Sequence, residues 1–334
     1  MNSKVILLAC CSMALVLAGC AKKPEPAAVG ADPGAGVSSG DVTPAATPAS
    51  SSVTINTGAP VDGDVTLTAP PRAVAGSRIE FTFTGPANAH DYIDIVPRGN
   101  TQTSGEISYV YVDAAAQNGV RAPASAGEYD LRYVLELGGE RKVKAVNALT
   151  VEAGKAELTA PAEAGSAEVL SIAWTGPNGQ GDYIDIVPKG FTGTSGEISY
   201  AYTSTGTPAK VVAPGPAGEY QVRYLLEGPG GRKVIASYPL VVKAATATLK
   251  APDTASKGAK LSVDWTGPKR NGDYVDLVPK GYDKTSGELS YFYATVGARG
   301  QLTAPVEAGE YEIRYVMEAP KERMVLAREA LTVR

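Results

Sequence analysis

The chain has few of the side chains on which most hydrolytic and metal-dependent sites rely. Its 334 residues include one histidine, His90, and three cysteines. Zinc sites and catalytic triads draw on histidine, on cysteine or on both. A single histidine cannot supply a triad, a zinc site or a histidine base to more than one copy of a repeated unit.

The sequence also lacks a block of positive charge. It carries 31 Lys and Arg and 35 Asp and Glu, a formal net charge of −4, and the two signs are interspersed. Proteins that bind nucleic acid usually gather Lys and Arg on one surface. We therefore predict no nucleic-acid partner.

A long apolar run occurs in the first 20 residues. Residues 5–18 are mostly apolar and follow Lys4, and the run ends in Leu-Ala-Gly-Cys at residues 17–20. The run is shorter than the about 20 residues that span a bilayer, and polar sequence follows it at once. It predicts a secretory signal peptide over residues 1–19.

The string LAGC resembles the lipobox of bacterial lipoproteins. The resemblance implies cleavage before Cys20, acylation of Cys20 with palmitate-type chains and attachment to a lipid bilayer. Ala21, and not Asp, follows the cysteine, which by the same resemblance favours the outer membrane of a Gram-negative envelope. The alternative is an ordinary cleaved signal in which LAGC is a coincidence. Because Cys10 and Cys11 lie in the signal, the mature chain would keep only Cys20 and could form no internal disulfide.

Residues 20–61 are dominated by Ala, Pro, Gly, Ser, Thr and Val. A segment with so few large apolar side chains cannot bury enough surface to offset the entropy of ordering it. We expect a disordered tether, whose root-mean-square span for about 40 residues is roughly 35 Å.

Beyond the tether, one set of phrases occurs three times at a spacing of 91 residues. HDYIDIVPRG at 90–99 becomes GDYIDIVPKG at 181–190 and GDYVDLVPKG at 272–281, and SGEISYVY and AGEYDLRYVLE recur in the same way. A fixed period of this kind indicates a tandem array of one structural unit. We predict three repeats, over residues 62–152, 153–243 and 244–334.

Short alternating segments, separated by Gly and Pro, fill each repeat. In the first repeat they are residues 66–68, 78–83, 91–96, 106–112, 120–122, 128–135 and 142–151. About seven short strands in 91 residues are typical of an immunoglobulin-like sandwich, and Gly127 with Tyr129 resembles its tyrosine corner. The predicted fold is all-β: three tandem immunoglobulin-like β-sandwiches after a signal peptide and a disordered tether.

Alternation along the strands assigns side chains to faces. Ile93 and Ile95 should face the core and Asp94 the opposite side, while Arg132 should point outward. Of 17 tyrosines, 15 fall in five repeated columns, and we interpret them as mostly architectural. One aromatic column, Phe83, Trp174 and Trp265, directly precedes a Thr-Gly-Pro turn in each repeat. We predict that these side chains fill one end of the core, with sugar stacking as the alternative.

A small set of polar residues recurs in every copy without an evident core role, and it is the candidate shared binding face. Its members are Asp94, Ser104, Glu106 and Arg132, then Asp185, Ser195, Glu197 and Arg223, then Asp276, Ser286, Glu288 and Arg314. The structural interpretation is that the charged columns form cross-strand ion pairs and turn caps. The Thr-Ser-Gly-Glu segment that holds two of them is either a turn that needs Gly and a hydroxyl or a recognition loop.

Calcium binding is a further hypothesis for the acidic columns, since carboxylate oxygens are ligands that this hard cation prefers. Asp91 and Asp94 are the weak candidates. They are three residues apart on a predicted strand and so face opposite sides, and the sequence has no DxDxDG loop. We predict no metal or cofactor, with calcium kept as the alternative.

The repeat, read as GDYIDIVPKG, SGEISYAY, AGEYQVRYLLEG and GRKV in the second copy, resembles an Ig-like repeat of bacterial secreted and lipid-anchored proteins, including tails of von Willebrand factor A domain proteins. It is distantly similar to the SKICH-type sandwich. The resemblance covers about 270 residues, and no von Willebrand domain precedes the repeats here. Three near-identical small sandwiches would be an unusual enzyme, even one using carboxylate pairs as glycosidases do.

The function expected from these observations is that of a membrane-anchored envelope lipoprotein. Its repeats would serve as a non-enzymatic binding or spacer module for an unknown protein or an envelope glycan. The alternatives are a periplasmic accessory subunit that binds one protein partner and a calcium-stiffened surface adhesin.

Overall fold

The computed structural model describes residues 54–115, 119–295 and 297–334. The predicted signal peptide, Cys20 and nearly all of the predicted tether lie outside them. In the first repeat, one sheet has the order β2-β9-β8-β5-β6, with β2 parallel to β9 and the other neighbours antiparallel. Its strands are β2 (Arg72–Val74), β5 (Tyr92–Pro97), β6 (Ser108–Tyr111), β8 (Gly127–Glu136) and β9 (Arg141–Glu152).

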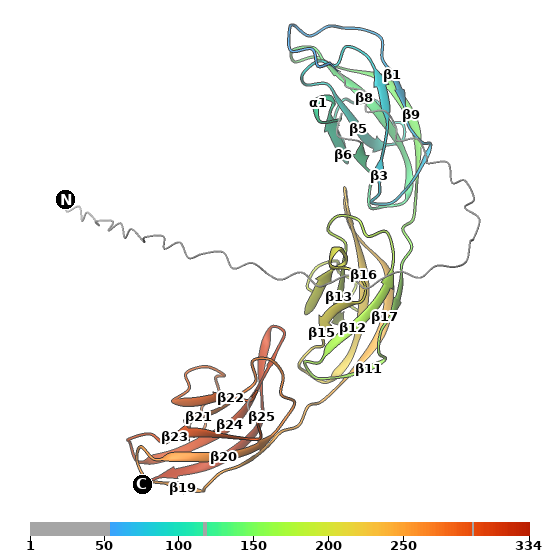
Figure 1. The fold of residues 1–334 in the computed structure, drawn as a ribbon. Coiled ribbons are helices and arrows are strands. Elements are labelled where there is room, and N and C mark those ends of the chain that lie inside the picture. Colours follow the sequence, from blue (N-terminus) through green and yellow to red (C-terminus); the bar gives the residue numbers. More distant parts are fainter. Residues whose placement is uncertain (1–53, 116–118, 296) are drawn as a thin grey trace, which may run out of the picture. The chain divides into compact units, whose positions relative to one another are not determined.

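The second layer of the first repeat is built from two antiparallel pairs (Figure 1). They are β1 (Thr66–Thr68) with β4 (Thr82–Thr84), and β3 (Arg78–Ile79) with β7 (Val120–Arg121). A single turn of helix, α1 (Val112–Ala115), follows β6.

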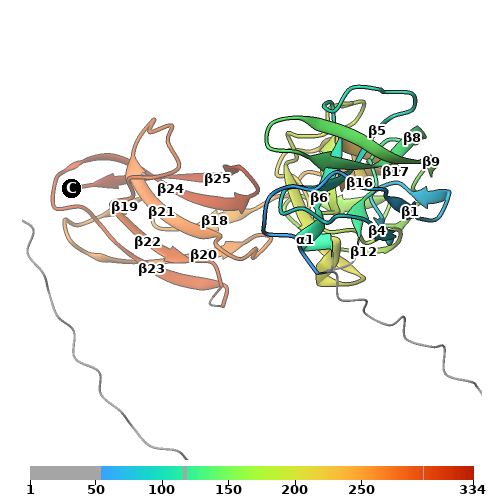
Figure 2. The same cartoon turned by 90° about the horizontal axis from the view of Figure 1, so that it is seen from above.

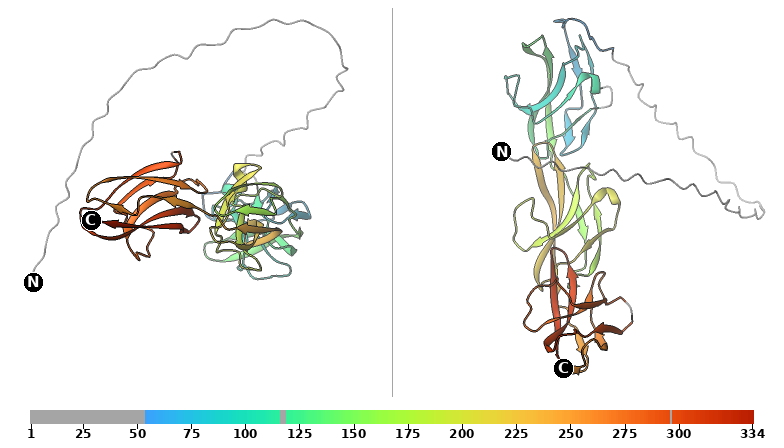
Figure 3. Two further views of the ribbon diagram at one scale, coloured as in Figure 1. Left: turned by 90° about the horizontal axis from the view of Figure 1, so that it is seen from below. Right: turned by 90° about the vertical axis from the view of Figure 1, so that its left-hand side faces the viewer.

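The second and third repeats have the same architecture with a continuous three-stranded second layer. The second repeat contains β10 (Glu157–Thr159), β11 (Glu163–Gly165), β12 (Val169–Thr175), β13 (Tyr183–Pro188), β14 (Ser199–Tyr202), η1 (Thr203–Thr205), β15 (Ala209–Val212), β16 (Gly218–Gly228) and β17 (Gly231–Lys243). The third contains β18 (Thr248–Lys250), β19 (Thr254–Ala255), β20 (Lys260–Thr266), β21 (Tyr274–Pro279), β22 (Ser290–Tyr293), β23 (Arg299–Thr303), β24 (Gly309–Ala319) and β25 (Glu322–Val333). Figure 2 shows the two layers of the third repeat, with β24 and β25 in one and β20 and β23 in the other, and Figure 3 shows the same repeat in orange and red from two further sides.

The all-β, immunoglobulin-like fold of the three repeats is therefore confirmed. Each strand lies within one predicted repeat, because the strands occupy residues 66–152, 157–243 and 248–333. The strand expected over residues 78–83 is split into β3 and β4, and residues 116–118, which precede β7, the ladder partner of β3, lie outside the described residues. β2 was not predicted, since three residues after two prolines carry no alternating pattern.

The core of each repeat lies between its two sheets and follows the predicted alternation. Ile93, Ile95 and Leu131 are fully buried, and their counterparts in the other repeats are buried in the same way. The column Phe83, Trp174 and Trp265 packs on the tyrosine of the facing strand at ring-centroid distances of 5.4, 5.7 and 5.6 Å. Trp265 is 2% exposed and lies in the core as predicted, whereas Phe83 and Trp174 are partly buried and pack against the core.

The tyrosine corner is present in all three repeats. The hydroxyl groups of Tyr129, Tyr220 and Tyr311 donate hydrogen bonds to the carbonyl oxygens of Ser125, Pro216 and Glu307 at 2.9, 3.0 and 3.2 Å. Each bond closes the connection that leads into the long strand, β8, β16 or β24. The sandwich thus keeps this connection fixed without a disulfide between its sheets.

We expect Tyr220→Phe to lower the free energy of unfolding of the second repeat by about 1 kcal/mol, because it removes one hydrogen bond and leaves the ring in place. Urea unfolding followed by the fluorescence of Trp174, in a Trp265→Phe background, measures this repeat alone. Phe83 occupies the equivalent position naturally, so the background change is mild. Tyr200→Phe, in which the ring is half exposed, is the control, and equal losses in both variants would contradict the role of the corner.

No helix among the described residues is long and apolar enough to cross a membrane.

Candidate functional site

The predicted polar residues Asp94 and Arg132 form a buried ion pair on neighbouring strands. They are direct cross-strand partners, and the Arg132 guanidinium donates to both oxygens of Asp94 at 2.9 and 2.6 Å. Both side chains are at most 1% exposed. Burial disfavours the charge of Arg132, but the hydrogen bonds to Asp94 raise its pKa above the ordinary value. The structural interpretation of these columns as cross-strand pairs is supported.

The same guanidinium also holds the loop that runs from β5 to β6. Arg132 Nη1 donates to the carbonyl oxygens of Asn100 and Gln102 at 2.9 and 2.7 Å. Arg223, which is paired with Asp185, donates to the carbonyl oxygen of Gly193 at 2.7 Å. Arg314, which is paired with Asp276, donates to that of Lys284 at 2.8 Å. The loop covers this part of the outer sheet face in each repeat.

The expectation that Arg132 points outward needs a correction. The strand alternation is as predicted, but the loop buries Asp94, Arg132 and their four counterparts. These side chains are occupied by one another and by loop carbonyls, so they are not available to a partner in this conformation.

Ser104 and Glu106, with their counterparts, lie on the covering loop. Ser104, Ser195 and Ser286 are exposed, and so is Glu106, whereas Glu197 and Glu288 are partly buried. Gly105, Gly196 and Gly287 have φ of 89°, 96° and 91°, a conformation that favours glycine. This geometry supports the interpretation of the Thr-Ser-Gly-Glu segment as a turn that needs glycine.

The weak calcium candidate Asp91 is part of a buried hydrogen-bond cluster. Its carboxylate accepts from the Tyr133 hydroxyl at 2.7 Å, from Glu136 N at 2.8 Å and from Asn88 N at 2.8 Å. Asp182 and Asp273 make the equivalent contacts with Tyr224 and Tyr315. The described residues contain no group of three or more His, Cys, Asp or Glu placed to hold a metal ion.

The sequence interpretation missed a pair of exposed tyrosines. Tyr109 and Tyr111 on β6, Tyr200 and Tyr202 on β14, and Tyr291 and Tyr293 on β22 are between 43% and 54% exposed. Each strand is at the edge of its five-stranded sheet. The architectural interpretation holds for the columns of Tyr92, Tyr129 and Tyr133, which are buried, and is wrong for these two columns.

The exposed pair has the same geometry in every repeat. Its rings are edge to face, with centroid distances of 5.6, 5.4 and 5.6 Å and interplanar angles of 84°, 83° and 84°. A third, buried tyrosine supports the pair: Tyr92 lies 6.2 Å from Tyr109 and 6.4 Å from Tyr111. We call each set the tyrosine cluster. Its members are Tyr92, Tyr109 and Tyr111, then Tyr183, Tyr200 and Tyr202, then Tyr274, Tyr291 and Tyr293.

Charged groups border each tyrosine cluster. The guanidinium groups of Arg141, Arg232 and Arg323 stack over the buried tyrosine at 5.5, 5.6 and 5.7 Å from the ring centroid. Burial raises the pKa of Tyr92, Arg141 opposes this increase, and Asp94 and Glu106 add to it. The Tyr92 hydroxyl donates to Thr103 O at 3.0 Å and so joins the cluster to the covering loop. These contacts fix the position of the buried tyrosine against which the exposed pair packs.

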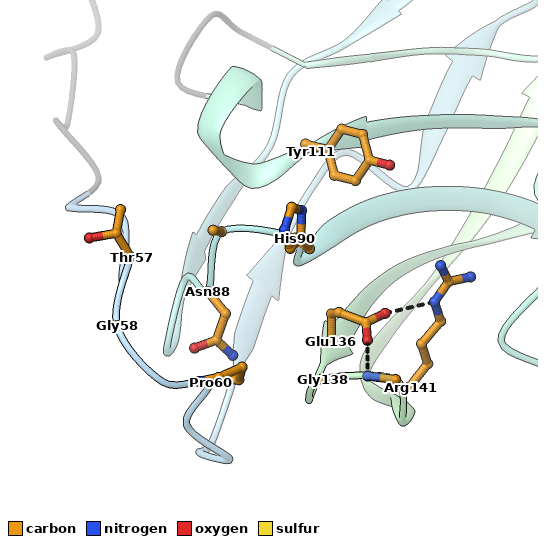
Figure 4. A pocket seen from close by; sticks show the side chains of 11 residues that line it. Thr57, Gly58, Pro60, Asn88, His90, Tyr111, Glu136, Gly138 and Arg141 are labelled. Carbon is orange, nitrogen blue, oxygen red and sulfur yellow. Dashed lines mark hydrogen bonds and ion pairs between the residues drawn. The ribbon is translucent and has the colours of Figure 1, made fainter.

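In the first repeat the tyrosine cluster borders a pocket of about 570 Å³ (Figure 4). Tyr111 and Arg141 line it together with Asn88, His90 and Glu136. The Glu136 carboxylate accepts from Gly139 N at 2.7 Å and from Arg141 Nε at 2.8 Å. Thr57, Gly58 and Pro60, from the segment before β1, complete the lining. The pocket is mostly polar and has one aromatic wall.

No protein-family model and no curated protein matches the chain, and no catalytic family is indicated. Among solved structures, the chain is similar to two chains described as marsupial T cell receptor, at 8% and 9% identity and TM-scores of 0.22 and 0.23. The matches cover 80% and 81% of this chain and 98% and 99% of those chains. It is also similar to dimeric latent PorU from Porphyromonas gingivalis, at 11% identity and a TM-score of 0.20, over 81% of this chain and 34% of that one. Likenesses this weak carry no argument, so the assignment of the fold rests on the strand order and the tyrosine corner.

Proposed function

We propose that the chain is a lipid-anchored protein of the bacterial cell envelope whose three immunoglobulin-like repeats act together as a non-enzymatic binding module. Acylated Cys20 would attach it to the lipid bilayer of the outer membrane. The observation that carries the binding role is the tyrosine cluster, exposed with one geometry in every repeat. Tyrosine is enriched among the residues that dominate binding energies, because it buries a large rigid ring at low entropic cost.

The threefold repetition of the cluster provides a mechanism for tight binding by weak sites. When three similar weak sites on one chain engage one partner together, the second and third binding events become intramolecular, and overall avidity can exceed a single affinity by about 10²–10⁴-fold. A partner with a repeating structure, such as an envelope glycan, uses this arrangement best. A periplasmic accessory subunit bound to one protein would need only one cluster.

The recurring aspartates are buried and offer no open pair of carboxylates to a substrate. Asp91 and Asp94 are occupied by hydrogen bonds inside each repeat and do not converge on a common open site. The calcium-stiffened adhesin has no support from their geometry. Titrating the full chain with calcium and finding a higher melting temperature would revive it.

We expect stepwise loss of binding when the exposed tyrosine pairs are replaced by alanine in one, two and three repeats of the full chain. Binding to envelopes isolated from cells that lack the protein is the measurement, and the six-residue variant should lose about 10²–10⁴-fold in affinity. Six Tyr→Phe substitutions at the same positions keep the rings and are the matched control. Loss confined to one repeat would favour the single protein partner, and full binding by the six-alanine variant would refute the proposal.

A further inference from the structure

The exposed tyrosine pair recurs in all three repeats, whereas the other large, exposed hydrophobic side chains of the described residues do not. Large hydrophobic side chains are exposed at other places in the described residues, for example at Val146, but its counterparts are Ser237 and Arg328. Among the residues that the structure describes, only the two tyrosine columns place a large, exposed hydrophobic side chain at the same position in all three repeats. Aliphatic side chains recur nearby at Ile107, Ile198 and Leu289, but only Leu289 is exposed. The feature that all three repeats offer to a shared partner is therefore the aromatic pair.

This composition distinguishes between partner classes. The centre of a protein interface is depleted of charged residues and combines aromatic with other apolar side chains. Each tyrosine cluster is instead bordered by charged groups, and no aliphatic column beside it is exposed in all three of the described repeats. A ligand that presents a weakly apolar face and many hydroxyl groups matches this surface better than a protein does.

The charges near each cluster disfavour acidic ligands. Arg141 faces two carboxylates: Glu136, which is bonded to it at 2.8 Å, and Glu106, whose charge acts on both Arg141 and Tyr92. The equivalent groups are Arg232, Glu227 and Glu197 in the second repeat and Arg323, Glu318 and Glu288 in the third. Because the buried Asp–Arg pair is neutral, the border has a net charge of about −1 in each repeat, which repels anionic polymers.

One acceptor at this border is free. Glu197 Oε2 is buried and has no hydrogen-bond partner among the described residues, whereas Glu288 Oε2 accepts from Gly287 N at 3.1 Å. Carboxylate oxygens accept strong, charge-assisted hydrogen bonds from hydroxyl groups. Because Glu197 Oε2 is buried, the carboxylate at this border that is exposed to a sugar hydroxyl is that of Glu106 in the first repeat.

We propose that each tyrosine cluster binds a pyranose unit of an uncharged linear polysaccharide. This inference rests on the proposed function and names the ligand of that site. The negative face of a tyrosine ring attracts the C–H groups of a sugar face, which the sugar oxygens polarise. The bordering glutamate accepts from sugar hydroxyls and the arginine donates to sugar oxygens. In the first repeat the pocket beside Tyr111 has the size of a small-ligand site and holds a further sugar unit.

The test uses the full chain and four soluble hexasaccharides. Three are neutral, made of N-acetylglucosamine, glucose or mannose, and the fourth is the acidic hexamer of galacturonate. Titration calorimetry should detect binding of at least one neutral hexamer and none of the acidic one. The six-alanine variant should bind the neutral ligand at least about 30-fold more weakly, as expected for the loss of dominant binding residues.

Two control variants test whether the loss of affinity is specific to the tyrosine rings. The six Tyr→Phe variant should retain most of the affinity. Replacing the exposed Val61, Val169 and Val306 by alanine should leave it unchanged. If no neutral hexamer binds, if the acidic hexamer binds best, or if the six-alanine variant binds as well as the original chain, the assignment of the ligand is wrong.

The outcome is separable from that of the proposed function. Tyrosine-dependent binding to envelopes without binding to any neutral hexamer would overturn the ligand and leave the binding module standing, with a protein as the partner. Loss of tyrosine dependence toward envelopes would overturn both.

Discussion

Arg223→Met will destabilise the second repeat by about 3–5 kcal/mol. The arginine is 1% exposed and donates to both oxygens of Asp185, at 3.0 and 2.6 Å. Removing it leaves a buried carboxylate without its partner and the Gly193 carbonyl without the donor at 2.7 Å, while the Phe191 carbonyl keeps its bond from Gln221 Nε2 at 2.8 Å. Breaking a buried ion pair from one side costs this much because the remaining charge stays desolvated.

The fluorescence of Trp174 reports the effect for this repeat alone. Trp174 packs on Tyr224 in the second repeat, and the Trp265→Phe background silences the third. A local reporter is needed because a chain of several repeats does not unfold as one two-state system. Urea titration of the two proteins should show the midpoint of the variant well below that of the original chain.

Arg232→Met is the matched control. Arg232 pairs with Glu227 in the same repeat, but its side chain is 42% exposed, and surface pairs are worth about 0–1 kcal/mol. The double variant Asp185→Leu/Arg223→Met should recover part of the lost stability, since it also removes the carboxylate that Arg223→Met leaves buried without a partner. Equal losses for Arg223→Met and Arg232→Met would show that burial of the pair contributes nothing.

The repeats could be predicted largely because local patterns and the fold agree. Alternation in DYIDIVP placed Ile93 and Ile95 in the core, and Gly127 with Tyr129 indicated the corner. Alternation could not show that Asp94 and Arg132 are buried. It assigned them to the outer face, and only the course of the loop that follows β5 covers them.

The exposed tyrosines were missed for a different reason. Both faces of the Ser-Tyr-Val-Tyr segment carry apolar side chains, so the pattern alone does not say which face meets the core. Pairing between strands decides it: Tyr111 is opposite Tyr92, which alternation had already placed on the outer face, while Val110 is opposite Ile93. The register of β5 with β6 is a long-range property that the segment itself does not encode.

Cys20→Ser will release the protein from membranes. In the proposed mature protein, the acyl chains on Cys20 are the anchor, and each contributes about 0.8 kcal/mol per buried methylene. A serine at this position has no sulfur atom to which the lipid can be attached, so the whole contribution is lost. The protein should move from the membrane pellet to the soluble fraction after cell disruption.

Cys11→Ser is the matched control, because that cysteine lies in the predicted signal and would be absent from the proposed mature chain. It should leave the protein in the pellet. Mass spectrometry of the original protein should find an N-terminal Cys20 that carries fatty acyl groups. An alkaline carbonate wash distinguishes true attachment from adsorption, and a Cys20→Ser protein that stays in the washed pellet would refute the anchor. Binding of envelope material by the released protein would then be measurable without detergent, so that anchoring and recognition by the tyrosine clusters can be assigned to separate parts of the chain.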